Sequence, residues 1–338
     1  MNKTTVRDIA KETGVSAATV SRALNGMSGV SAYNRQIILA AAEKLGYAHT
    51  NFKKPINSVD ANLIALFAPS LKNPFYADLL DNCIQRLSVL GHQPIIASFS
   101  LEKAQFIDVL DNLSSLPLKG LILLSALYDP TNYLDAIHKT RIPTVLLLNR
   151  PLDGFNGSTV IQDNFQAGYT ATRHLIELGH KKIVFLNGPR SAPAMQDRIN
   201  GYQKATANYG LICDSDWIFE GDLTADSGRK LAKRFLENQR SLPDALICAN
   251  DLMAIGFMDE FKKSGKCIPE DISLIGFDDI MISGIAGIDL TTMRQNSQDM
   301  GRQTAELLHR RIINPQCQNE NVIFDPKLVV RKTTAPKA

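Results

Sequence analysis

Apolar residues recur at helical spacing in three short stretches of the first 46 residues, and polar residues lie between them. The inward-facing positions, in chain order, are Val6, Ile9 and Ala10, then Val20, Ala23 and Leu24, then Ile38, Ala41, Ala42 and Leu45. This spacing predicts three amphipathic helices. The second and third begin after the capping residues Ser16 and Ser31. Thr13–Ser16 contains a glycine and predicts the tight turn of a helix-turn-helix between the first two helices.

From Asn62 onward, short apolar runs alternate with amphipathic stretches such as Phe75–Leu90, Gln166–Leu178 and Leu252–Lys263. The runs that predict strands are Leu63–Phe67, Pro94–Ser98, Gly120–Leu124, Pro143–Leu148, Val160–Gln162, Lys182–Leu186, Ala245–Cys248, Ser273–Gly276 and Lys327–Arg331. The alternation of strand and helix indicates parallel, doubly wound sheets, and this number of strands is enough for two. The predicted fold class is an all-α helix-turn-helix head joined to an α/β part with two doubly wound parallel-sheet lobes.

The composition is that of a globular chain, with 44% hydrophobic and 21% charged residues. No apolar run approaches the roughly 18 residues needed to cross a bilayer, so no membrane partner is expected. The first 15 residues are charged throughout and lack the apolar core of a signal peptide. We therefore expect a cytoplasmic protein.

Charge is distributed unevenly along the chain. Residues 1–60 hold eight basic and four acidic side chains, whereas the whole chain has a net charge of +3, so the remaining part is slightly acidic. This asymmetry favours a polyanionic partner for the head alone. A solvated helical face gives the same signal, so charge by itself does not decide between these two interpretations.

The predicted second helix exposes residues suited to reading DNA. Ala17 and Ala18 are small enough for the backbone to enter the major groove, and their methyl groups can contact a thymine methyl. Arg22, one turn further on, can donate to O6 and N7 of a guanine. The short polar side chains suited to phosphate oxygens are Ser16, Thr19, Ser21 and Asn25. On these patterns alone, an ordinary three-helix bundle stays open as the alternative.

The stretch "TVRDIAKETGVSAATVSRALNG", followed by "VSAYNRQIILAAAEKLGY", resembles the head of the lactose-repressor (LacI/GalR) family of bacterial transcription regulators. The resemblance spans residues 4–47 without a gap. It implies base contacts for Ala17, Ala18 and Arg22. It implies contacts with the DNA backbone for Thr5, Ser16, Thr19, Ser21, Asn25 and Ser31. The partner implied is a double-stranded, pseudo-palindromic operator.

The family usually continues with a short hinge helix that enters the minor groove, where an apolar residue opens the central base step. At the matching positions Lys54 replaces the usual arginine and Ile56 keeps the apolar wedge. Pro55 departs from the pattern, since a proline inside a helix costs on the order of 3 kcal/mol. The hinge helix therefore either ends by Lys54 or stays irregular, and a plain basic linker is the alternative.

Polar residues follow several predicted strands, and ligands of doubly wound folds bind at the carboxyl ends of the strands. Among them are Asp163-Asn164, Asn250-Asp251 and Phe277-Asp278-Asp279. Carboxylate and amide groups bind paired sugar hydroxyls, an aromatic ring covers the apolar face of a sugar, and Arg198 in "MQDRINGY" adds a cation. Each residue taken singly is more typical of a turn or a helix cap. Their joint position favours a sugar site.

The resemblance continues over residues 62–332 and includes the periplasmic sugar-binding proteins. It implies ligand contacts for Asn73 or Phe75, Asp163, Arg198, Asn250, Asp278 and Gln295, with Phe277 as a stacking ring. The effector expected is a monosaccharide or a derivative of one, and a purine or a phosphoprotein is the alternative. No cofactor and no metal are expected, because the five cysteines are scattered without a CxxC pair and no metal-binding motif occurs.

These patterns predict a DNA-binding domain over residues 1–48, a hinge over 49–61 and an effector domain over 62–338. The N-lobe is expected over about 62–161 plus 292–319 and the C-lobe over about 162–291 plus 320–332, with crossings near Gln162, Thr291 and Asn319. No leucine heptads follow the last predicted strand, so a homodimer is expected rather than a tetramer.

The predicted function is that of a transcriptional regulator of a carbohydrate-utilisation operon, and a repressor is the form expected. An enzyme is disfavoured, because the sequence has no GxGxxG, Walker A, GxSxG or HExxH motif and catalysis leaves the head unexplained. His174 and His180 share no metal-binding face. A sugar receptor with a vestigial head is the other alternative, and an assay of DNA binding separates it from a regulator.

Overall fold

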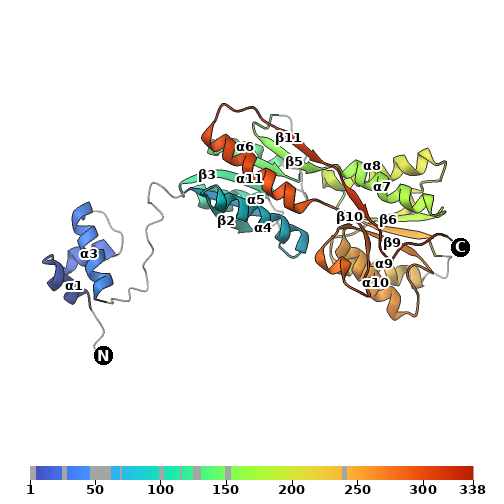
Figure 1. Ribbon diagram of the computed structural model, residues 1–338, viewed down its shortest axis with the longest axis horizontal. Coiled ribbons are helices and arrows are strands. Elements are labelled where there is room, and N and C mark those ends of the chain that lie inside the picture. The colour runs from blue at the N-terminus through green and yellow to red at the C-terminus, as the bar shows by residue number, and fades with distance from the viewer. Residues whose placement is uncertain are drawn as a thin grey trace. The chain divides into compact units, whose positions relative to one another are not determined.

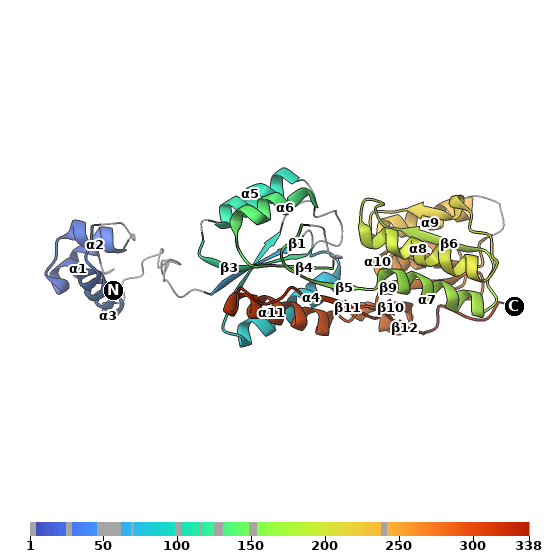
Figure 2. The same cartoon turned by 90° about the horizontal axis from the view of Figure 1, so that it is seen from above.

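The computed structural model describes residues 5–24, 29–45, 62–68, 71–98, 103–114, 116–124, 131–148, 154–237 and 242–337. The chain forms two compact units, residues 1–61 and residues 62–338. The division after residue 61 agrees with the predicted start of the effector domain, whereas the boundary expected at residue 48 lies outside the described residues. Figures 1 and 2 show the elements within each unit. Within the described ranges, no helix is long and apolar enough to cross a membrane.

The first unit contains the three predicted helices, α1 (Val6–Thr13), α2 (Ala17–Leu24) and α3 (Ala32–Lys44). α1 starts at a capping box, in which the backbone N and the hydroxyl of Thr5 both donate to Oδ2 of Asp8 at 2.7 Å. It ends at Gly14, whose φ of 70° lies in the left-handed region. The buried side chains that join the helices are Ile9, Val20, Ala23, Ile38, Ala41 and Ala42. The head therefore has a hydrophobic core of its own.

The N-lobe of the second unit is a six-stranded sheet in the order β11-β5-β4-β3-β1-β2, in which all neighbouring strands run parallel. Its strands are β1 (Leu63–Ala68), β2 (Gln93–Ser98), β3 (Leu118–Leu124), β4 (Thr144–Leu147), β5 (Ser158–Gln162) and β11 (Asn321–Phe324). One face is covered by α4 (Pro74–Val89) and α11 (Ser297–Ile313), and the other by α5 (Lys103–Ser114) and α6 (Thr131–Thr140) (Figure 2).

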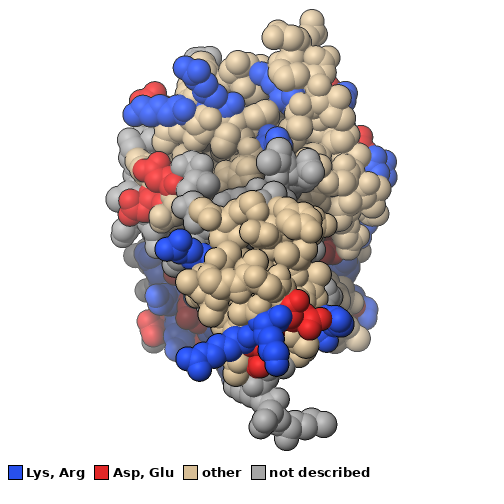
Figure 3. Space-filling view, turned by 90° about the vertical axis from the view of Figure 1, so that its left-hand side faces the viewer, with Lys and Arg blue, Asp and Glu red and all other residues tan. Residues whose placement is uncertain are grey.

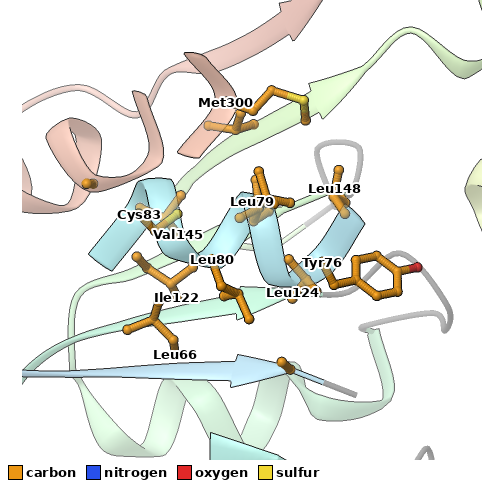
Figure 4. Packing of buried hydrophobic residues seen from close by; sticks show 14 of the residues in the cluster. Leu66, Tyr76, Leu79, Leu80, Cys83, Ile122, Leu124, Val145, Leu148 and Met300 are labelled. Carbon is orange, nitrogen blue, oxygen red and sulfur yellow. The ribbon is translucent and has the colours of Figure 1, made fainter. Parts of the chain in front are cut away.

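The core beneath α4 holds the N-lobe together. Leu79 and Cys83 of α4 are fully buried among side chains of the sheet, such as Ile122, and Met300 of α11 closes the cluster (Figure 4). A parallel sheet with helices on both sides is shielded from water on both faces, which is why its strands read as continuous apolar runs. This property made them recognisable in the sequence.

The C-lobe has the same architecture, with strand order β12-β10-β9-β8-β6-β7. Its strands are β6 (Ile183–Asn187), β7 (Ile218–Glu220), β8 (Ala245–Cys248), β9 (Ser273–Asp278), β10 (Thr291–Arg294) and β12 (Lys327–Val329). Only β12 runs antiparallel to its neighbour, β10, among the pairs of this sheet in the described residues. α7 (Asn164–Glu177) and α8 (Pro193–Asn208) pack on one face, and α9 (Ala225–Glu237) and α10 (Asp251–Lys263) pack on the other.

The chain passes between the lobes three times, and two of the predicted crossings are corrected. The first follows Gln162, as predicted. The second lies between Arg294 and Ser297, because β10 pairs with β9 in the C-lobe sheet through Arg294. The third lies between β11 and β12 rather than near Asn319, because β11 pairs with β5 at the edge of the N-lobe sheet. The assignment of residues 320–332 as a whole to the C-lobe was therefore wrong.

Candidate functional site

The exposed face of α2 carries the predicted base-reading residues. Ala17, Ala18 and Arg22 are exposed, while Val20 and Ala23 are buried on the opposite side. Because residues four positions apart lie on one helix face, the methyl group of Ala18 and the guanidinium of Arg22 share a surface, and Ala17 is exposed next to Ala18. Figure 3 shows groups of Lys and Arg side chains with uncharged surface between them. On α2 itself, two small exposed side chains and one long donor make a surface that can approach base edges closely.

Three of the predicted backbone-contacting residues begin helices. Thr5 caps α1, Ser16 accepts from the backbone N of Thr19 at 3.1 Å, and Ser31 accepts from the backbone N of Asn34 at 3.2 Å. The hydroxyls of Ser16 and Thr19 also lie 2.8 Å apart. Helix starts present free N–H groups to anions, so these positions suit phosphate oxygens. Ser21 lies on α2, whereas Asn25, Lys54 and Ile56, and Pro55 with them, lie outside the described residues.

A cavity lies between the two lobes. It is lined by Asn73, Phe75, Tyr76, Leu148, Asn164, Ala194, Met195, Arg198, Leu223, Ala249, Asn250, Asp278 and Gln295. Six of the eight residues predicted to bind the effector are therefore brought together. The mixture of apolar and polar walls is typical of small-molecule sites. The residues enter from the starts of helices and the ends of strands, as expected for doubly wound sheets.

Asp278 is the acceptor at the centre of the cavity. Its Oδ2 accepts from Nδ2 of Asn73 at 3.0 Å, and its Oδ1 accepts from Nε2 of Gln295 at 2.5 Å. Its φ of 109° is unfavourable for a residue with a side chain, so the surrounding structure must hold the backbone there. Asp279, next along the chain, is fixed by Arg294 and Arg331 at 2.6 Å each.

Arg198 is the cation of the cavity and is 4% exposed. Its Nε donates to Oδ1 of Asn164 at 2.9 Å, and its Nη1 donates to the carbonyl oxygen of Ala249. Burial lowers the pKa of Arg198, and the nearby Asp278 carboxylate opposes that effect. Burial likewise raises the pKa of Asp278, and the Arg198 charge counteracts it. The two groups therefore stabilise each other's charged forms.

The prediction that Phe277 stacks on the ligand was wrong. Its ring lies beneath Arg198, with the guanidinium carbon 4.5 Å from the ring centroid, and it is not among the cavity walls. Successive residues of a strand point to opposite faces, so Asp278 and Phe277 at the end of β9 cannot both reach the cavity. Phe277 holds Arg198 in place, and the aromatic walls come from Phe75 and Tyr76 of α4.

Asp163 also falls outside the cavity, and its neighbour Asn164 takes the place expected for it. The Asp163 side chain accepts from the backbone N of Gln166 at 2.8 Å and caps α7. Asn164 is buried, binds Arg198 through Oδ1 and donates from Nδ2 to the carbonyl oxygen of Gln162 at 3.1 Å. Both residues follow the strand side by side in the sequence, but no pattern shows which one caps the helix and which one lines the cavity.

Asn250 combines two roles. Its Oδ1 accepts from the backbone N of Met253 at 2.9 Å and caps α10, while its Nδ2 donates to the carbonyl oxygen of Leu223 at 2.8 Å. Leu223 is one of the cavity walls that the sequence did not indicate, together with Tyr76, Leu148, Ala194, Met195 and Ala249. Most of these are apolar residues, which carry no chemical signal in a sequence.

The two aromatic walls oppose the polar ones. The rings of Phe75 and Tyr76 are 5.6 Å apart, and burial raises the pKa of Tyr76. Figure 4 shows the Tyr76 ring extending beyond the cluster formed by Leu79 and Leu80. An apolar N-lobe surface thus faces the amide, carboxylate and guanidinium groups of Asn250, Asp278 and Arg198. The arrangement suits a small ligand with many hydroxyls and an apolar face.

Asp251, beside Asn250, is structural. Its Oδ2 accepts from the backbone N of Ile280 at 2.9 Å and from the hydroxyl of Ser283 at 2.6 Å, and its Oδ1 accepts from Thr292 at 2.6 Å. Burial, and the charge of Asp278, raise its pKa. The carboxyl anchors the segment after Asp278. Among the residues that the structure describes, no group of His, Cys, Asp and Glu side chains is arranged to hold a metal ion.

Two parts of the chain match known families. Residues 5–50 match the bacterial regulatory proteins of the lacI family, and residues 172–334 match the periplasmic binding protein-like domain. The HTH-type transcriptional repressor PurR of Histophilus somni (strain 129Pt) is 30% identical over 331 residues, which cover 97% of this chain and 98% of PurR.

Solved structures are similar over almost the whole chain. The lac repressor dimer bound to operator and the anti-inducer ONPF is 27% identical, with a TM-score of 0.74 and coverage of 99% of this chain and 100% of the repressor. The complex of the transcriptional regulator CelR with cellobiose is 28% identical, with a TM-score of 0.73 and coverage of 98% and 100%.

Proposed function

The chain belongs to the LacI family of bacterial regulatory proteins, and we propose that it is a homodimeric repressor of carbohydrate-utilisation genes. It is a transcriptional regulator with a DNA-binding head and a ligand-binding domain. The proposed effector is a monosaccharide or a derivative of one, bound in the cavity between the lobes. Its binding changes the affinity of the head for the operator. The proposed role needs no cofactor and no catalysis, and it places the protein with the chromosome in the cytoplasm.

The Arg198 guanidinium and the Asp278 carboxylate, which line one cavity with Phe75 and Tyr76, carry the proposal for the effector. Adjacent sugar hydroxyls donate to a carboxylate and accept from a guanidinium, and the C–H face of the ring packs on aromatic carbon. Amide groups from Asn73, Asn164, Asn250 and Gln295 add further donors and acceptors at the same cavity. That a similar regulator binds cellobiose supports a carbohydrate.

Exposed apolar side chains support the homodimer. Met281 of the short 3₁₀ helix η2 (Met281–Gly284) is 84% exposed, and Ile285 and Leu71 are exposed as well. A contiguous patch of exposed apolar side chains marks a surface that meets a partner, and we assign these three residues to such a patch in the proposed dimer. The similar lac repressor is a dimer on its operator, which a two-fold site requires. Light scattering of the full chain measures the mass directly.

A thermal-shift screen of free and phosphorylated monosaccharides, with purines in the same plate, identifies the effector. A ligand at 100 times its Kd stabilises a folded protein by about 2.7 kcal/mol, which is easily detected. The compound found is then added to a gel-shift assay of the full chain on genomic fragments. A sugar that stabilises the chain and changes the retarded fraction supports the proposal. Stabilisation by purines alone contradicts the proposal that the effector is a sugar. Failure to retard any DNA fragment contradicts the proposal that the chain regulates transcription by binding DNA.

A further inference from the structure

Arg35 of α3 contacts the end of α2 that carries Arg22. Its Nη1 donates to the carbonyl oxygen of Ala23 at 2.9 Å. Ala23 is 3% exposed and lies in the last turn of α2, where the carbonyl groups have no N–H partner within the helix. The guanidinium therefore supplies a buried carbonyl with a partner that the helix itself cannot provide.

α2 depends on its neighbours for its position. It has 8 residues, and isolated helices shorter than about 12 residues are marginal in water. Its start is fixed by the cap at Ser16, and its middle by the burial of Val20 in the core of the head. Its end is fixed by Arg35, and a cation at a helix C-terminus is also favoured by the helix dipole.

We propose that Arg35 is a positioning residue for base reading, a role that rests on the proposed DNA-binding function. Arg22 directly precedes Ala23, so a shift of the last turn of α2 moves the base-reading guanidinium. A bidentate contact with a base tolerates little displacement. Arg35 holds that turn from the protein side and contributes to sequence discrimination without touching a base.

Two other roles for Arg35 give different signatures. A side chain that binds a phosphate strengthens binding to every sequence, and its loss reduces the salt slope by about 0.9. A side chain that only stabilises the head loses its effect when the variant head is kept fully folded. A positioning residue changes the ratio between preferred and unrelated DNA at an unchanged salt slope.

The experiment uses the full chain with Arg35→Gln and Arg35→Lys, and with Lys44→Gln as the matched control. Lys44 is also a cation of α3, but it pairs with Glu12 of α1 at 2.9 Å and its side chain is 74% exposed. The preferred duplex is selected by the wild-type chain from a randomised library, and an unrelated duplex of the same length serves as reference. Affinities are measured over a range of salt concentrations and at two temperatures below the melting of each variant.

We expect Arg35→Gln to lower the ratio of preferred to unrelated affinity about 10-fold, the effect of one buried charge-assisted hydrogen bond. Arg35→Lys recovers part of the ratio, Lys44→Gln leaves it unchanged, and Arg22→Ala combined with Arg35→Gln loses little more than Arg22→Ala alone. Equal losses on both duplexes with a smaller salt slope, or a ratio restored by cooling, overturn the inference. A wild-type chain that selects no sequence overturns the proposed function and this inference together, whereas the other failures leave the proposed function standing.

Discussion

Nδ2 of Asn73 donates to Oδ2 of Asp278 at 3.0 Å and joins the two lobes across the cavity. Asn73 precedes α4 in the N-lobe, and Asp278 ends β9 in the C-lobe. A ligand whose hydroxyls bind Asp278 meets an oxygen that already accepts a hydrogen bond from the opposite lobe. Effector binding and the contact between the lobes therefore act on the same carboxylate.

Substitution of Asn73 tests that link. Asn73 also caps α4, because its Oδ1 accepts from the backbone N of Phe75 at 3.0 Å, and aspartate is an equally good cap. Asn73→Asp keeps the cap but places a second carboxylate against Asp278, so we expect sugar affinity by calorimetry to fall about 10-fold or more. Asn73→Ser keeps the cap without the added charge and serves as control, with a smaller loss. Wild-type affinity in Asn73→Asp contradicts the link.

Arg22→Ala tests the reading of bases by α2. Arg22 is the long donor on the exposed face formed with Ala17 and Ala18, so its loss is expected to remove about 1–3 kcal/mol of base discrimination. Residual, salt-dependent affinity persists because phosphate contacts remain. Competition binding against single-base variants of the preferred duplex measures the effect. Unchanged preference at every base pair contradicts the assignment.

The pH dependence of effector binding follows from Asp278. Burial raises its pKa to about 6, above the ordinary 3.8. The carboxylate accepts ligand hydroxyls, so protonation competes with binding, and sugar affinity falls as the pH drops below about 6. For folding the sign is opposite: the charged buried carboxyl costs stability above about pH 6, and this cost disappears below 3.8. Calorimetry between pH 5 and 8, with Asp278→Asn as a weak, pH-independent control, checks the first effect.

A histidine pair gives the N-lobe a separate pH dependence. Nε2 of His92 lies 2.9 Å from Nδ1 of His309, and burial, with His309 adding to it, lowers the pKa of His92 below 6.5. The unfolded chain then binds more protons than the folded one, so stability is complete above pH 6.5 and falls as the pH drops through the lowered pKa. We expect a lower melting temperature at pH 5 than at pH 7.5, with a smaller difference in His92→Gln. Equal differences in the two chains contradict this account.

The fold was predicted where burial covers both sides of an element. All the strands predicted within the lobes are present, and several of them, such as β1 and β9, are buried on both faces. The strands that were missed, β7, β10 and β11, have three or four residues each, and β7 and β11 have no buried residue. Their place in a sheet depends on the neighbouring strand, so a single stretch of sequence does not reveal it. The wrong third crossing followed from missing β11.

The sequence predicted several of the residues that line the cavity, but not all of them. Arg198, Asn250, Asp278 and Gln295 line the cavity because the ends of parallel strands converge there. Asp163 and Phe277 were placed wrongly in the cavity. Asp163 caps α7, and its neighbour in the sequence, Asn164, lines the cavity instead. Phe277 points to the other face of β9 from Asp278, because side chains alternate along a strand. Neither distinction is visible without the backbone.

The most direct test of the account is the response of operator affinity to the sugar in three chains. The wild-type chain, Arg198→Ala and Asp278→Ala are titrated against the selected duplex with and without the sugar from the thermal-shift screen. Asp163→Asn, which keeps the cap of α7 outside the cavity, serves as control. We predict that the sugar changes the affinity of the wild type and the control equally, and that both cavity variants bind the duplex normally but do not respond. If either cavity variant responds to the sugar at the same sugar concentration as the wild type, the cavity is not the effector site.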